Sequence, residues 1–179
     1  MKKTLLTPEK IVKKLKDVFK DKIKETWIET RKAGQKKKEY TNIWIKIHRD
    51  AFKKCVKYIT DKIDYPHLAV VSGNDLGENI ELIYHFSVYY GHRLGEISIN
   101  ISVDLPKEDP RIESICDIIP GALITEREKQ EMLGVIVEGI PDTRRFFIPD
   151  DFPEGIYPWR KDEKGPQKFV RDLYEGDKK

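Results

Sequence analysis

The chain has 179 residues, of which 39% are hydrophobic and 36% are charged, and its formal net charge is +3. This length suits one domain with a core that needs no disulfides. The two cysteines, Cys55 and Cys116, exclude a four-cysteine zinc site or iron–sulfur cluster and indicate a reducing cytoplasm, and no apolar run approaches the roughly 18 residues of a membrane span.

The first third of the chain predicts a helix, a hairpin and a second helix. Thr7-Pro8 is a helix N-cap followed by proline at the first helical position, and apolar residues then repeat at helical spacing. Residues 23–30 and 40–47 are predicted to form the two strands of a hairpin, joined by a polar, lysine-rich loop. Asp50 is placed to cap the second helix.

Three further strands are predicted in the middle of the chain. Residues 68–72 are almost continuously apolar, which favours a central strand, whereas residues 80–88 and 97–103 alternate strictly between apolar and polar. The resulting order is α-β-β-α-β-β-β. Two helices cannot cover both faces of a five-stranded sheet, so we expect a two-layer α+β domain with a mixed or antiparallel sheet.

The character of the sequence changes after Leu105-Pro106. Prolines recur through the rest of the chain, and no strong strand pattern follows. We therefore divide the chain into an α+β domain, residues 1–105, and an extended proline-rich C-terminal arm, residues 106–179. Such an arm cannot build its own core, so it is expected to pack on the domain and on partner subunits.

Local physical chemistry explains part of the arm. Thr125 with Glu128 three residues later predicts a capping box at the start of a short helix. Gly134 can take the left-handed position that ends this helix. Arg127 and Glu131 have the spacing of a surface ion pair.

The arm also carries three motifs in a fixed order. They are Glu126-Arg127-Glu128, then Glu131-Met132-Leu133-Gly134, then the run from Gly139 through Pro141-Asp142 to Arg144-Arg145. Together they resemble the signature of the C-type subunit of the respiratory NADH dehydrogenase, complex I, over about residues 80–162. The segment from Pro153 to Asp162 is more similar to the K-type subunit of archaeal energy-converting membrane-bound [NiFe]-hydrogenases, or of their sulfur-reducing sister complexes.

The resemblance implies a non-catalytic, peripheral subunit on the cytoplasmic face of the cell membrane. Its partners would be a large hydrogenase-like or complex I-like subunit, iron–sulfur subunits and membrane ion-pump subunits. The iron–sulfur clusters, and a [NiFe] centre where there is one, would lie in those partners, with no cofactor in this chain. Residues expected at the subunit interface are Glu126, Arg127, Glu128, Glu131, Asp142, Arg144, Arg145, Phe147 and Trp159.

The two arginines at the end of the third motif leave two possibilities open. Arginine binds carboxylates through a planar fork, which suits a fixed pair across an interface. Alternatively, Arg144 and Arg145 pair within the chain, with Glu126, Glu128 or Glu131.

No catalytic arrangement is found in the sequence itself. The four histidines, His48, His67, His85 and His92, have no metal-ligand spacing, and no phosphate-binding loop is present. Catalysis is thus expected only from the assembled oxidoreductase complex. The open alternatives are the C-type subunit of an NADH- or ferredoxin-dependent dehydrogenase or of a sulfur reductase.

The distribution of charge suggests an alternative of another class. Residues 1–60 contain 19 basic and 7 acidic side chains, and the alternative that they suggest is a free nucleic-acid-binding α+β domain. No aromatic residues interleave these lysines in a binding motif, which favours a solvated surface and no nucleic-acid partner. Abundant lysine and glutamate with only 3 Gln and 4 Asn are typical of hyperthermophile proteins.

Overall fold

A computed structural model of the chain describes residues 5–35, 37–92 and 95–169. Lys36, part of the turn predicted before residue 97, and the tail beyond residue 169 lie outside the described residues. The main elements follow the chain in this order: α1 (Pro8–Phe19), β1 (Ile23–Ala33), β2 (Lys38–Ile47), α2 (Arg49–Lys62), β3 (His67–Asp75), β4 (Asn79–Val88), β5 (Ile97–Pro106), β6 (Arg111–Glu113), α3 (Ala122–Leu133) and β7 (Ile136–Glu138). Two short 3-10 helices lie at Lys20–Lys22 and Gln167–Phe169.

The predicted α+β class and the mixed five-stranded sheet are confirmed. The strand order is β1-β2-β5-β4-β3, with β2 and β5 parallel and the other neighbours antiparallel. At the start of α1, Thr7 accepts a hydrogen bond from the backbone N–H of Lys10, as the N-cap prediction requires. In α2, however, the N-cap residue is His48, and Asp50 lies in the first turn and pairs with Lys22.

The prediction of a central strand at residues 68–72 is wrong. The strand β3 is at the edge of the sheet, and Val70 on it is 42% exposed. The most buried strand is β5, which pairs with β2 and β4. An apolar run indicates burial on both faces only when neighbouring strands and layers cover it, and β3 has a neighbour on one side alone.

One face of the sheet carries the hydrophobic core. Alternate residues of β4 and β5 point into it, and side chains of α1 and α2 cover it, including Leu15 and Phe52. The third helix lies on this same face, because a Cβ atom on Gly73 of β3 would clash with the Leu133 side chain of α3. The molecule therefore has two layers, helices on one face of the sheet and no described helix on the other.

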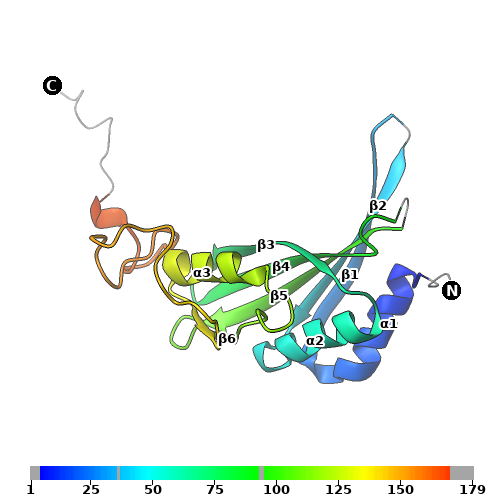
Figure 1. Cartoon of the computed structure of the whole chain (residues 1–179), viewed down its shortest axis with the longest axis horizontal. Helices are drawn as coiled ribbons and strands as arrows, with labels where there is room; N and C mark the ends of the chain where they lie inside the picture. Colours follow the sequence, from blue (N-terminus) through cyan, green and yellow to red (C-terminus); the bar gives the residue numbers. More distant parts are fainter. Residues whose placement is uncertain (1–4, 36, 93–94, 170–179) are drawn as a thin grey trace.

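The first part of the arm belongs to this core. The strands β6 and β7 pair in parallel as a small second sheet, which the sequence did not predict. Ile112, Ile115, Leu133 and Val137 join the hydrophobic cluster of the main domain. Figure 1 shows that the remainder of the arm lies beside α3 at one end of the molecule, while the β1–β2 hairpin projects at the opposite end.

Candidate functional site

The candidate site is a loop of the arm that α3 holds by its backbone. The helix begins at Ala122, with Gly121 as its N-cap residue, and ends at Gly134 in the left-handed conformation, with φ +73°. The prediction that Gly134 ends this helix is thus confirmed, whereas the prediction of a capping box at Thr125 and Glu128 is wrong. Thr125 lies inside the helix and its hydroxyl donates to the carbonyl of Ala122, so it is not available to cap the helix.

Glu126 fixes α3 to the core. Its carboxylate accepts hydrogen bonds from the Tyr84 hydroxyl at 3.2 Å, the Ser114 hydroxyl at 2.6 Å, the Ile115 N–H at 3.2 Å and the Cys116 thiol at 3.3 Å. Glu126 is only 1% exposed. Burial raises the pKa of this carboxyl, and its hydrogen bonds oppose the rise. The residue joins α3 to β4 and to the segment after β6.

Arg127 binds the carbonyl side of the loop that we call the Arg-Phe loop, residues 142–148. Its guanidinium donates to the backbone carbonyl of Arg144 from both Nε and Nη2, and to that of Arg145 at 3.4 Å. Its Nη1 also pairs with Asp142 at 3.2 Å. The Arg127 side chain is 7% exposed, so this helix residue uses its planar fork inside the chain.

Glu131 binds the N–H side of the same loop. One turn further along α3, its carboxylate accepts the backbone N–H groups of Phe146, Phe147 and Ile148 at 2.7, 2.8 and 2.9 Å. The predicted ion pair of Arg127 with Glu131 is therefore wrong, because each residue binds loop backbone instead. Charge-assisted hydrogen bonds of this kind are about twice as strong as neutral ones, so the loop is held in one conformation.

The side chains of the Arg-Phe loop remain available at the surface. Phe146 and Phe147 are 59% and 43% exposed, and their rings meet edge to face with centroids 4.9 Å apart. The Arg144 side chain is 85% exposed. The loop thus combines a fixed backbone with two exposed aromatic rings and a cation, which is the composition of an interface centre.

The two consecutive arginines have different partners. Arg144 donates to both carboxylate oxygens of Asp142, from Nε at 3.0 Å and from Nη2 at 2.8 Å. The hydrogen bond from Arg144, followed by the charges of Arg127 and Arg144, lowers the pKa of Asp142 well below its usual range. Arg145 donates to the carbonyls of Pro149 and Phe152. Both arginines thus pair within the chain, but not with Glu126, Glu128 or Glu131.

A second aromatic group lies further along the arm. Trp159 is 42% exposed, and its ring lies beside Lys129 of α3. The distance from the ring centroid to the ammonium nitrogen of Lys129 is 4.6 Å. Lys129 is buried and pairs with its neighbour Glu128. Burial lowers the pKa of Lys129, which this carboxylate opposes. The backbone N–H of Trp159 also donates to the backbone carbonyl of Met132, so α3 positions this part of the arm as well.

The far end of the arm is fastened to the domain by four charged side chains that the sequence reasoning missed. Asp75, at the end of β3, has a fully buried side chain and accepts from Lys107 at 2.7 Å and from the Lys161 N–H at 2.8 Å. Asp162 pairs with Lys107 at 2.8 Å and with Arg160 at 2.5 Å. We call Asp75, Lys107, Arg160 and Asp162 the four-charge cluster.

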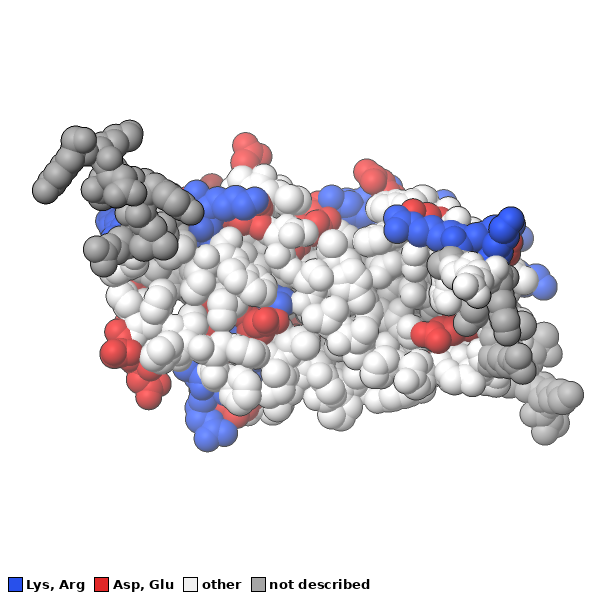
Figure 2. Space-filling model, turned by 90° about the horizontal axis from the view of Figure 1, so that it is seen from above, with Lys and Arg blue, Asp and Glu red and all other residues white. Residues whose placement is uncertain are grey.

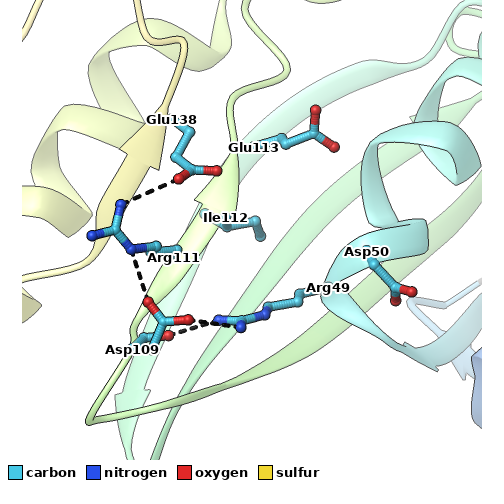
Figure 3. Close-up of a pocket in the computed structure, with 7 residues that line it drawn as sticks. All are labelled: Arg49, Asp50, Asp109, Arg111, Ile112, Glu113 and Glu138. Atoms are coloured by element: carbon cyan, nitrogen blue, oxygen red, sulfur yellow. Dashed lines mark hydrogen bonds and ion pairs between the residues drawn. The ribbon is translucent and has the colours of Figure 1, made fainter.

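A pocket of about 320 Å³ lies between α2 and the small β6–β7 sheet (Figure 3). Arg49 donates to the side chain and the carbonyl of Asp109, both at 2.7 Å, and Arg111 joins Asp109 to Glu138. Figure 3 shows these groups meeting along one wall, while Glu113 and Asp50 stand apart. The ion pairs connect the domain with the arm, and their carboxylates are already engaged with arginine.

The remaining chemistry of the described residues is limited. Among residues 5–35, 37–92 and 95–169, no group of three or more His, Cys, Asp or Glu side chains has the arrangement to hold a metal ion. Burial raises the pKa of the Cys55 thiol to about 12 and that of Cys116 to about 11, so neither is a ready nucleophile. No helix in this part of the chain is long and apolar enough to span a bilayer.

The nine residues expected at an interface are thus divided by the structure. Glu126, Arg127 and Glu131 bind groups of their own chain, and Glu128 and Asp142 pair with neighbouring cations. Arg145 binds loop carbonyls. Arg144, Phe147 and Trp159 are exposed, and Phe146, which was not among the nine, lies with them. Their contact with another subunit remains a prediction.

Comparison with known proteins gives consistent matches. Residues 45–168 match the family described as respiratory-chain NADH dehydrogenase, 30 Kd subunit. The membrane-bound hydrogenase subunit beta of Pyrococcus furiosus is 36% identical over 165 residues, covering 92% of this chain and 91% of the relative. The C subunit of the F(420)H(2) dehydrogenase of Methanosarcina mazei is 31% identical, covering 71% of this chain and 79% of the relative.

Two solved structures share the fold. A chain of the membrane-bound sulfane sulfur reductase, an archaeal respiratory membrane complex, aligns with a TM-score of 0.67 at 20% identity and covers 95% of this chain and 96% of that one. A trypsin-resistant fragment of Nqo5 aligns with a TM-score of 0.56 at 22% identity and covers 75% of this chain and 97% of the fragment.

Proposed function

We propose a function from the premise that the chain belongs to the family of the 30 Kd subunit of the respiratory-chain NADH dehydrogenase and is a subunit of a complex I-like or membrane-bound hydrogenase complex. On this proposal it is a non-catalytic peripheral subunit of a membrane-bound, ion-translocating oxidoreductase of the hydrogenase type. It docks on the large subunit with the [NiFe] or quinone site and stabilises it. In this role the chain lies on the cytoplasmic face of the membrane.

The single observation that supports docking is the Arg-Phe loop. A flexible loop would lose conformational entropy when it binds, but Arg127 and Glu131 already hold this backbone in place. The exposed Phe146 and Phe147 then need only be desolvated. Aromatic side chains and arginine are the residues that most often dominate the binding energy of an interface.

The proposal assigns the redox centres to partner subunits. The described residues offer no metal cluster, and the two thiols are buried with raised pKa values. Iron–sulfur subunits and membrane ion-pump subunits make up the rest of the complex. The identity of these partners decides whether protons, a quinone or a sulfur compound is the terminal acceptor.

The basic first third of the chain does not favour nucleic-acid binding over a role in an oxidoreductase complex. Several of its lysines have carboxylate partners, such as Lys22 with Asp50 and Lys46 with Asp104. Lys53 pairs with Asp117. A nucleic-acid site needs cations that are available to phosphates, and these pairs reduce that availability.

The proposal is tested by purifying the tagged chain from detergent-solubilised membranes. We expect a hydrogenase-like large subunit and iron–sulfur subunits to co-purify with it, and to remain bound at a salt concentration that strips polyanions. Recovery of the chain alone from the soluble fraction, or with nucleic acid that salt removes, would contradict the proposal.

The variant Arg144→Ala should lower the amount of complex recovered in the same purification. Arg144 is an exposed cation of the same loop as the two phenylalanines, and its loss removes one proposed contact without altering a redox centre. Activity per assembled complex should therefore equal that of the wild type. A variant that assembles fully but turns over slowly would show that Arg144 serves chemistry or coupling instead.

A further inference from the structure

The sheet face opposite the helices carries a row of side chains with no described element over it. The pairing of the strands places one residue from each strand side by side across this face. From one edge to the other they are Val70, His85, Asn100, Trp44 and Trp27. We call these five residues the tryptophan row. Figure 2 shows the molecule from above the view of Figure 1, and the middle of the surface seen there has few charged side chains.

The row is held rigidly by contacts among its own members. Trp27 and Trp44 stack with ring centroids 5.4 Å apart and planes 5° apart. Trp44 meets the His85 ring edge to face at 6.4 Å. His85 in turn makes hydrogen bonds to Asn100 at 2.7 Å and to Ser72 at 2.9 Å. Rings that are already fixed lose little rotamer freedom on binding, so they are suited to anchoring a contact.

The outer members of the row are open to solvent. Trp27 is 47% exposed and Val70 is 42% exposed, at opposite edges of the sheet. Trp44 and His85 between them are partly exposed. The internal contacts of the row therefore explain its order but leave aromatic and aliphatic surface uncovered.

The charges around the row decide what kind of partner fits. Among the side chains that the structure describes, carboxylates outnumber cations on and beside this face. The carboxylates are those of Glu25, Glu29, Glu81, Glu96 and Asp104, and the cations are Lys24, Lys46 and Arg31. An aromatic sheet face could stack nucleic-acid bases, but that mode needs a cationic surface along the backbone phosphates. The acidic surround instead complements a protein surface with an apolar centre and basic margins.

We propose that the tryptophan row is a second docking surface, which binds a partner protein of the complex through apolar side chains over Trp27 and Trp44 and basic side chains toward the surrounding carboxylates. The inference rests on the proposed function, because it requires a multi-subunit complex. It adds a contact on the open sheet face, separate from the Arg-Phe loop beside α3 (Figure 1). The subunit would then hold partners on two sides.

Hydroxyl-radical footprinting of the unmodified chain tests the proposal. Oxidation of Trp27 is measured by mass spectrometry in the isolated chain and in the purified membrane complex, and Trp159 in the arm is measured in the same samples. We expect Trp27 to be oxidised at least about fivefold more slowly in the complex, since a docked protein excludes solvent from the aromatic residue that anchors it. Equal oxidation of Trp27 in both states would overturn the proposal.

The two tryptophans separate this proposal from the proposed function. Protection of Trp159 without protection of Trp27 would refute the second surface and leave docking through the arm intact. Absence of any partner in the purification would refute the proposed function itself. Protection of Trp27 supports the second surface whatever Trp159 shows.

A pair of variants on the same strand completes the test. Trp27→Ala removes the anchor, whereas Thr30→Ala truncates an exposed residue that points to the other face of β1. We expect Trp27→Ala to lower recovery of one partner subunit about tenfold and Thr30→Ala to leave it unchanged. An oligonucleotide, or a second copy of the chain, that binds the wild type but not Trp27→Ala would overturn the proposal by naming a different occupant.

Discussion

Asp75→Ala should lower the free energy of unfolding of the isolated chain by about 3–5 kcal/mol, the usual cost of removing one partner from a buried charge cluster. Asp75 neutralises Lys107 and also accepts the backbone N–H groups of Gly77 and Lys161. Alanine leaves these N–H groups without an acceptor and leaves Lys107 and Arg160 with Asp162 alone. Urea denaturation measures the loss without changing the ionic strength.

Asp61→Ala is the matched control. Asp61 pairs with Lys57 on the exposed side of α2, with 47% of its side chain accessible. Surface pairs of this spacing contribute about 0.3–0.5 kcal/mol, so this variant should unfold almost as the wild type does. Equal losses in the two variants would show that the four-charge cluster does not fasten the arm.

The effect of Asp75 should depend on pH in a defined direction. Burial alone would raise its pKa, but hydrogen bonds from Lys107 and from the N–H groups of Lys161 and Gly77 together lower it below the ordinary 3.8. The unfolded chain therefore binds the proton more readily. The contribution of Asp75 is present above about pH 4 and is lost as the pH falls through the lowered pKa, so wild type and Asp75→Ala should converge in acid.

Glu126→Ala should cost about 3 kcal/mol or more, because it leaves several buried donors without an acceptor and opens a cavity beneath α3. The donors are the hydroxyls of Tyr84 and Ser114 and the N–H of Ile115. Glu126→Gln keeps one carbonyl oxygen in the same place and should lose less. Thermal or urea unfolding of the two variants gives the comparison.

The pH dependence at Glu126 should have the opposite sign from that at Asp75. Burial raises the pKa of Glu126 above its ordinary 4.5. Stability from this group is therefore complete below about pH 4.5 and falls as the pH rises to the raised pKa. Glu126→Gln cannot titrate, so the wild type should gain stability relative to it on acidification through this range. A difference that stays constant with pH would contradict the assigned shift.

Much of the fold could be predicted from periodicity. Strict alternation in β4 and β5 placed Leu82, Tyr84 and Ile101 on the core face, where all three are fully buried. Periodicity failed for β3, because a run such as Leu68–Val71 carries no information about which strands stand beside it. The position of a strand in a sheet is set by long-range pairing. In the structure β3 pairs with β4 and with no other strand of the sheet, and this pairing shows that it is an edge strand.

The candidate site was predictable in its motifs but not in its contacts. The motifs named Arg127, Glu131 and Arg144, and spacing alone suggested that the first two would pair with each other. In the structure Arg127 and Glu131 instead bind the backbone of a loop about 15 residues further along the chain. The spacing of side chains on a helix does not predict contacts of this kind. The helix begins at Ala122, directly after Pro120-Gly121. The capping pattern at Thr125 favoured a later start and led to the wrong prediction.

The four-charge cluster had no local signal at all. Asp75 accepts a hydrogen bond from the backbone N–H of Lys161, 86 residues further along the chain. In the sequence, each member of the cluster has the character of a solvated surface residue. What makes them one site is the meeting of the ends of β3 and β5 with the arm. Such a cluster is found only when the fold has brought its members together.

The central claim, that the exposed side chains of the Arg-Phe loop dock the subunit, is tested most directly by the recovery of partner subunits with the Phe146→Ala/Phe147→Ala double variant. Val18→Ala, which truncates a 49% exposed apolar residue of α1 at the other side of the molecule, is the control. We predict a folded double variant that retains at most about one-tenth of the partner bound by the wild type, and full recovery with Val18→Ala. Full recovery of partners with the double variant would contradict the claim.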